Sequence, residues 1–151
     1  MKKILVSACL LGCSCRYDGQ SKPCQKVIDL AEDNVLIPIC PEQMGGMTTP
    51  RNPSERQRDE NGNLLSTDMP GAIKANDGKD VTDNYNRGVE IALKIAELNK
   101  IDYAILKSGS PSCGTGLIYD GSFSGKKTKG YGITAEVLLK AGYKVISEED
   151  L

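Results

Sequence analysis

Short apolar runs recur along the chain and predict buried β-strands. Residues 3–8 and 35–39 are apolar and branched over nearly their whole length, which is typical of strands covered on both faces. Residues 102–107 and 144–147 also read as strands. Pro38 lacks a backbone N–H and limits the pairing of the second run. We therefore expect these four runs to be strands.

Apolar residues at helical spacing lie between these runs. A helix is expected to open at Pro23. A longer helix is predicted from Thr82, a suitable N-cap, to Asn99, which suits its end. A third helix is expected from Thr134 to Ala141. The apolar stripes of the first two helices are Val27, Leu30 and Ala31, and Tyr85, Val89, Ala92, Leu93 and Ala96.

The segment from Pro41 to Asp80 is the least regular part of the sequence. It is crowded with Gly, Pro, Asn and charged residues, and a structureless loop of this length is unusual in a compact domain. We predict a functional, lid-like insertion with a small hairpin about Asn61-Gly62. Asp120-Gly121 predicts a further hairpin turn, flanked by residues 117–119 and Phe123.

Strands that alternate with helices predict a parallel sheet with right-handed crossovers. The expected fold class is α/β, a three-layer sandwich with a mostly parallel, Rossmann-like sheet. The 151 residues are the size of one domain and contain neither an internal repeat nor a linker. Residues 1–151 are therefore expected to form a single domain.

Composition and charge exclude several classes of partner. The net charge is −1 and only 5% of residues are aromatic, so we expect no nucleic-acid binding. No apolar stretch approaches the ~18 residues of a membrane span. The start of the chain imitates a lipoprotein signal ending before Cys13, but its apolar part is very short and cleavage would remove Cys9. We expect a cytoplasmic protein with reduced thiols. The sequence carries no signal for the oligomeric state.

The chain contains six cysteines and no histidine, so imidazole ligands and Cys-His or Ser-His nucleophile pairs are excluded. Cys9, Cys40 and Cys113 each lie beyond a predicted strand, in a segment rich in Gly, Pro or Ser. The carboxyl ends of parallel strands share the sheet edge where such folds bind ligands. A lone cysteine is more often a small buried apolar residue. Three thiolates without a fourth ligand suit a [4Fe–4S] cluster with one open iron better than structural zinc.

The remaining cysteines, Cys13, Cys15 and Cys24, compete for a fourth ligand position. One residue separates Cys13 from Cys15, which is tighter than in zinc ribbons or thioredoxin-like motifs. Auxiliary or incidental roles are therefore favoured over ligation. Two alternatives to this cluster enzyme stay open: a non-catalytic protein that binds a metal or an Fe–S cluster, and a thiol redox protein that uses Cys13, Cys15 or Cys24.

Several polar residues near the predicted site could take part in chemistry. Glu42 is a candidate general acid or base. Ser110 and Ser112 could donate hydrogen bonds to substrate or cluster sulfur, or shape the turn. Lys107 could place positive charge near an anionic cluster, and Asp18 is either a second carboxylate or, more readily, a turn residue. Neither a dinucleotide fingerprint nor a Walker loop is present.

At these positions the chain resembles a known bacterial family. The matching blocks are Val6-Ser7-Ala8-Cys9-Leu10-Leu11-Gly12 with Cys15-Arg16-Tyr17-Asp18-Gly19, Cys40-Pro41-Glu42 with Gly45-Gly46 and Thr49-Pro50-Arg51, and Asp80-Val81-Thr82 with Lys107 and Ser110-Pro111-Ser112-Cys113-Gly114. Together they resemble a family formerly labelled a domain of unknown function and typified by 2-thiouracil desulfurase. The resemblance spans nearly the whole chain.

The resemblance implies an enzyme with a [4Fe–4S] cluster held by Cys9, Cys40 and Cys113. The fourth iron would take the sulfur of a small thio-compound, such as a thiolated nucleobase. Water would attack the ring carbon without any redox step, and sulfide would be released. In this interpretation Glu42 activates water or relays its proton, and the serines before Cys113 orient the substrate or donate a proton.

Overall fold

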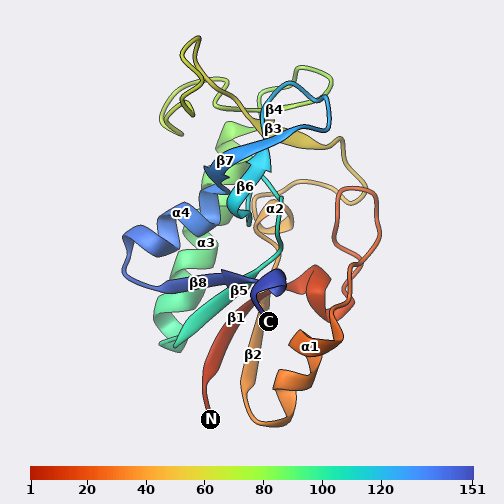
Figure 1. The fold of residues 1–151 in the computed structure, drawn as a ribbon, viewed down its shortest axis with the longest axis vertical. Coiled ribbons are helices and arrows are strands. Elements are labelled where there is room, and N and C mark those ends of the chain that lie inside the picture. Colours follow the sequence, from red (N-terminus) through yellow and green to blue (C-terminus); the bar gives the residue numbers. More distant parts are fainter.

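The computed structural model describes residues 1–151 and has a parallel four-stranded sheet at its centre (Figure 1). The strands are β1 (Lys3–Ser7), β2 (Val35–Ile39), β5 (Tyr103–Leu106) and β8 (Lys144–Ser147), in the order β2-β1-β5-β8. All four predicted strands are thus present. β2, which contains Pro38, lies at one edge of the sheet and pairs only with β1.

Side chains alternate between the two faces of the sheet and build a separate core on each. Leu5 packs with Ala92 and Ala96 under α3 (Thr82–Asn99) and α4 (Ile133–Lys140). On the opposite face, Ile4 and Val6 pack with Val27 of α1 (Gln25–Ile28) and with η1 (Ala8–Leu11). The sheet therefore lies between two helical layers (Figure 1), which confirms the predicted three-layer α/β fold.

The helices agree with the sequence prediction except near their starts. The first begins at Gln25, two residues after Pro23, and after one turn continues as the 3-10 helix η2 (Asp29–Glu32). Thr82, predicted to be the N-cap of α3, is its first helical residue instead. The Asp80 carboxylate accepts from the Thr82 N–H (3.0 Å), so an anionic oxygen takes the capping role. The Thr82 hydroxyl accepts from the Ile73 N–H (3.1 Å) and fastens the insertion to this helix.

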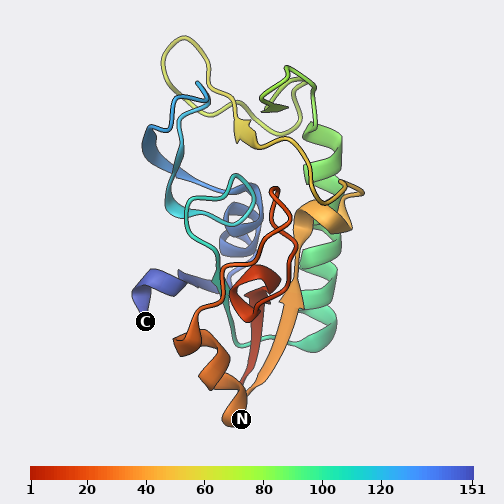
Figure 2. The same cartoon turned by 90° about the vertical axis from the view of Figure 1, so that its right-hand side faces the viewer.

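The segment from Pro41 to Asp80 contains more regular structure than expected. It holds α2 (Pro41–Met44) and the antiparallel pair β3 (Ser54–Arg56) and β4 (Ile73–Ala75). The hairpin predicted about Asn61-Gly62 is present as an antiparallel bridge between Arg58 and Leu64. β3 and β4 lie beyond the carboxyl edge of the main sheet (Figure 2) and pack on α3 through Tyr85.

The predicted second hairpin exists, but its turn is longer than expected. β6 (Thr115–Tyr119) pairs with β7 (Lys127–Tyr131), so Phe123 lies in the connection and not in the returning strand. The Glu55 carboxylate explains the difference, because it accepts from the backbone N–H groups of Gly121 (2.9 Å) and Phe123 (3.2 Å). These bonds hold residues 120–126 against β3.

Gly88 permits the close approach of α2 to α3. A Cβ atom at this position would lie 1.9 Å from the carbonyl oxygen of Pro41. We expect Gly88→Ala to lower the free energy of unfolding by about 1–3 kcal/mol, because the backbone of α2 must move. Chemical denaturation against Glu90→Ala, an exposed site on the same helix, measures this. Equal stability of the two variants would contradict such packing.

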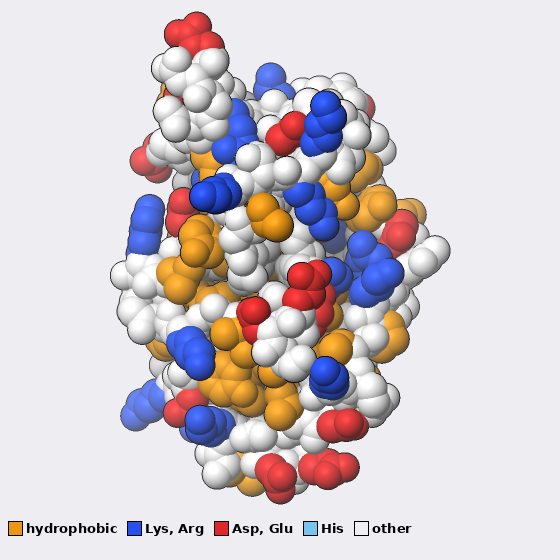
Figure 3. Space-filling view, viewed as in Figure 1, with side chains coloured by type: hydrophobic (Ala, Val, Ile, Leu, Met, Phe, Trp, Pro, Cys, Tyr) orange, Lys and Arg blue, Asp and Glu red, His pale blue; other side chains and the backbone are white.

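Charged side chains of both signs are interspersed on the face seen in Figure 3, in keeping with the net charge of −1. None of the helices combines the length and the apolar character needed to cross a membrane.

Candidate active site

A cavity of about 420 Å³ opens at the carboxyl edge of the sheet. Its walls come from the segments that follow β1, β2 and β5, and from β3 of the insertion. Parallel α/β sheets bind ligands at this edge, because the loops after adjacent strands converge there. The sequence prediction placed the candidate chemistry at the same edge.

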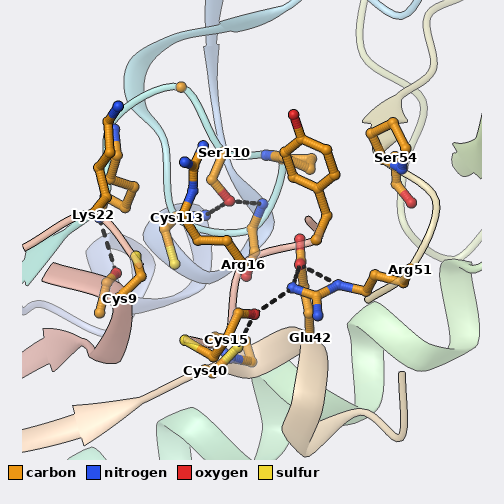
Figure 4. Close-up of a pocket in the computed structure, with 18 of the residues that line it drawn as sticks. Cys9, Cys15, Arg16, Lys22, Cys40, Glu42, Arg51, Ser54, Ser110 and Cys113 are labelled. Atoms are coloured by element: carbon orange, nitrogen blue, oxygen red, sulfur yellow. Dashed lines mark hydrogen bonds and ion pairs between the residues drawn. The ribbon is translucent and has the colours of Figure 1, made fainter. Parts of the chain in front are cut away.

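Three cysteines reach this cavity from three neighbouring strands. Cys9 lies in η1 directly after β1, and Cys40 follows β2 at the start of α2. Cys113 lies in the loop after β5. Since β2, β1 and β5 are adjacent in the sheet, residues 31 and 73 positions apart in the sequence line one cavity (Figure 4).

Burial favours the neutral form of two thiols of this cavity, Cys113 and Cys40. Complete burial raises the pKa of Cys113 to about 12, although hydrogen bonds with Ser7 and Ser112 lower it. A hydrogen bond with Cys15 and burial raise the pKa of Cys40 above the usual range. A metal bound here must therefore displace protons, which makes its affinity depend on pH.

Cys15 contributes a fourth thiol to the cavity, whereas the other two cysteines lie outside it. Cys15 is buried in one cluster with Cys9, and the Cys40 thiol packs against this cluster and donates to the Cys15 carbonyl oxygen (3.7 Å). Cys13 is exposed, and Cys24 packs under η1 without lining the cavity. All six cysteines are free. Of Cys13, Cys15 and Cys24, only Cys15 thus lines the cavity.

Glu42 lines the cavity from the first turn of α2, and both its carboxylate oxygens are engaged. The Tyr85 hydroxyl donates to Oε1 (2.6 Å), and Arg51 donates to Oε2 from Nε (2.8 Å) and from Nη2. The Arg51 and Glu42 side chains are only 6% and 14% exposed, so the pair is largely shielded from water. Their bonds fix the orientation of the carboxylate in the cavity (Figure 4).

The serines before Cys113 have defined structural partners. The Ser110 hydroxyl accepts from the backbone N–H groups of Ser112 (3.0 Å) and Cys113 (3.1 Å), which shapes the turn. The buried Ser112 hydroxyl hydrogen-bonds to the Thr134 hydroxyl (2.9 Å) as well as to the Cys113 thiol. Ser110 thus holds the cysteine backbone, while Ser112 touches its sulfur.

Lys107 and Asp18 are placed differently from each other. Lys107 lines the cavity, but its ammonium group pairs with Glu148 (3.1 Å) and bonds to Ser108. Asp18 is exposed and does not line the cavity; its carboxylate accepts from the Gln20 N–H (3.0 Å). The structure therefore gives Asp18 the turn role that the sequence analysis preferred.

The donor set and charge of the cavity fit an Fe–S cluster. Thiolates are the protein ligands of such clusters, and cluster and ligands together are anionic. No three His, Cys, Asp or Glu side chains are arranged to hold a single metal ion. Five cationic side chains and only two carboxylates line the cavity. They are Arg16, Lys22, Arg51, Lys107 and Lys127, against Glu42 and Glu55.

Tyr85, Arg51 and Ser54 are among the residues of the cavity that received no role from sequence reasoning. Tyr85 was placed only in an apolar helical stripe, yet its buried hydroxyl must find a partner, and that need was the available signal. Arg51 lies in an irregular segment whose path the sequence does not determine. Ser54 lies in β3 and lines the cavity near Tyr85. Its buried hydroxyl has no hydrogen-bond partner.

Fold and site define an α/β protein with a cysteine-lined cavity at the carboxyl edge of a parallel sheet. A sequence model of the family described as "2-thiouracil desulfurase" matches residues 4–150. The chain belongs to this family, and the resemblance identified from the sequence is confirmed. The family is one of enzymes that act on C–S bonds, so the expectation of an enzyme is confirmed as well.

Two known proteins are similar to this chain. The Bacillus subtilis (strain 168) protein YbbK, described as uncharacterized, is 43% identical over 148 residues, which are 98% of this chain and 97% of that protein. The solved structure of the [4Fe-4S]-dependent thiouracil desulfidase TudS (DUF523Vcz) superposes with a TM-score of 0.83 at 40% identity. The match covers 100% of this chain and 93% of that one.

Proposed function

We propose that this protein is a [4Fe–4S]-dependent desulfurase that removes sulfur from a thiolated nucleobase, such as 2-thiouracil, by non-redox hydrolysis. The observation that carries this proposal is the approach of Cys9, Cys40 and Cys113 to one cavity that Glu42 also lines. The dependence of the similar protein TudS on a [4Fe–4S] cluster supports the cofactor. The overall change converts C=S and water into C=O and hydrogen sulfide, so atoms balance without an oxidant.

Cys9, Cys40 and Cys113 would hold the cluster. When bound, it supplies one iron without a protein ligand, a Lewis acid that polarises the C=S bond. The Ser7 hydroxyl accepts from the Lys107 N–H (2.9 Å), which leaves its proton free for the Cys113 sulfur. Such hydrogen bonds orient a ligand and tune its metal.

Glu42 is the proposed base. Each carboxylate oxygen has two lone pairs, so Glu42 can accept a proton from water while it keeps its bonds to Arg51 and Tyr85. Because two donors hold the carboxylate in place, it keeps a fixed orientation toward the water from which it takes the proton. Glu42 then returns the proton to the departing sulfide, which gives the residue both a base and an acid role.

Anaerobic reconstitution followed by an assay with 2-thiouracil tests this function. We expect about four irons and four sulfides per chain, as a [4Fe–4S] cluster requires. Uracil and sulfide should then form in equal amounts without added reductant or oxidant. Colourless protein with one tightly bound zinc would favour the non-catalytic alternative. Turnover that consumes thiol equivalents would favour the redox alternative.

A further inference from the structure

Cys15 is a buried thiol at the proposed cluster site that the reaction above does not use. The residue is 6% exposed and lies in one buried cluster with Cys9, and Cys40 packs against this cluster. Cys9 and Cys40 are two of the three proposed ligands. Figure 4 shows Cys15 beside Cys40 at the cavity wall. Cys13, only two residues away, is exposed and lies outside the cavity.

The loop that carries Cys15 is held from two sides. Arg51 Nη2 donates to the Cys15 carbonyl oxygen (2.9 Å), and the Cys40 thiol approaches the same oxygen at 3.7 Å. The Cys15 N–H donates to the Cys13 carbonyl oxygen (2.8 Å). Arg51 also binds Glu42, so one guanidinium group links Cys15 to the rest of the site. The position of this thiol is therefore built into the cavity.

We propose that Cys15 is a positioning residue that donates its one S–H hydrogen bond to a cluster-bound sulfur, that of Cys9 or that of Cys40. This inference rests on the proposed function, because it requires the cluster. Iron deprotonates its thiol ligands, so Cys9 and Cys40 would keep no proton of their own. Cys15 then supplies the remaining S–H group among the three sulfurs, and a sulfur is an acceptor for such a weak donor.

Ligation by Cys15 fits the proposed function less well. The three strand-end cysteines would leave one iron of the cluster without a protein ligand, and a fourth thiolate would occupy it. A Cys15 that stays protonated would instead leave this iron open to the substrate.

A hydrogen bond to a ligating sulfur withdraws electron density from the iron. It therefore raises the reduction potential and strengthens the open iron as a Lewis acid. Cys15→Ala should keep its iron and sulfide but shift the potential to a more negative value. We expect kcat to fall roughly tenfold, the lower end for loss of an outer-shell partner, with a smaller change in KM.

The test compares wild type, Cys15→Ala, Cys15→Ser and Cys13→Ala, each reconstituted anaerobically. Iron and sulfide are counted, and the potential is measured by a dye-mediated redox titration followed by electron paramagnetic resonance. The expected order places Cys15→Ala at the most negative potential, Cys15→Ser nearer to wild type because its hydroxyl still donates, and Cys13→Ala at the wild-type value.

Two results would overturn the assignment while leaving the proposed function intact. The first is an unchanged potential in Cys15→Ala, and the second is loss of the cluster from both Cys15 variants, which would make Cys15 a ligand. Absence of a cluster from the wild type itself would overturn the inference and the proposed cofactor together. Thermal unfolding of each cluster-free variant separates these results from misfolding.

Discussion

Replacing Cys113 by serine is expected to abolish both cluster binding and desulfurase activity. Serine has nearly the same shape, but its hydroxyl is a hard oxygen ligand where an Fe–S cluster prefers thiolate. Cys113 is 5% exposed, so solvent has little access to replace the lost ligand. We expect activity to fall by more than about 100-fold, beyond the range for outer-shell partners. Iron and sulfide content and the rate of uracil formation measure the effect.

Cys24→Ser is the matched control, because Cys24 is a partly buried cysteine outside the cavity. It should retain the cluster and the wild-type rate. A Cys113→Ser protein with four irons and wild-type turnover would exclude Cys113 from the ligand set. It would also remove the main argument for the function proposed above.

Glu42→Gln is expected to lower kcat by about 10²–10⁴-fold, the range for loss of a positioned general base. The amide has nearly the same volume but cannot take a proton from water. Its oxygen can still accept from Tyr85, while Arg51 loses its ionic partner. Breaking a shielded ion pair destabilises a fold, so the melting temperature should fall as well. The rate must therefore be measured well below that temperature, and normalised to cluster content.

Asp18→Asn provides the comparison for the charge change, since Asp18 is an exposed carboxylate that does not line the cavity. It should turn over at the wild-type rate. The role of Glu42 as a base would be rejected by a fully loaded Glu42→Gln enzyme that stays within a few-fold of wild type. A fall in both variants would instead point to a general effect of lost negative charge.

The strands of the main sheet were predictable because they are buried on both faces. Residues 3–7 carry apolar side chains to two separate cores, so nearly every position must be apolar. Element ends were less predictable, since caps depend on neighbours. Thr82 is a good N-cap by residue type, but its N–H donates to Asp80 and its hydroxyl accepts from the Ile73 N–H, so the hydroxyl does not cap the helix. Phe123 lies in the turn and not in the predicted strand, because its N–H donates to the carboxylate of Glu55, 68 residues away in the sequence.

The candidate site also contains residues that could be predicted from the sequence and residues that could not. Cys9, Cys40 and Cys113 could be grouped from the sequence because the parallel-strand rule alone brings strand ends to one edge. The role of Arg51 could not be anticipated, because the insertion that carries it has no strong periodicity. Its path depends on contacts with Tyr85 of α3 and with the Cys15 carbonyl, which exist only after the chain has folded.

The sequence by itself determined the layered α/β fold, the convergence of three cysteines and the family to which the chain belongs. These follow from local apolar periodicity and from residue types at fixed spacing, which need no knowledge of distant contacts. Only the tertiary structure decided that Cys15, and neither Cys13 nor Cys24, joins the cavity, and that Asp18 stays outside it. It also set the partners of Glu42, since hydrogen bonds depend on directions and distances between segments that are remote in the sequence.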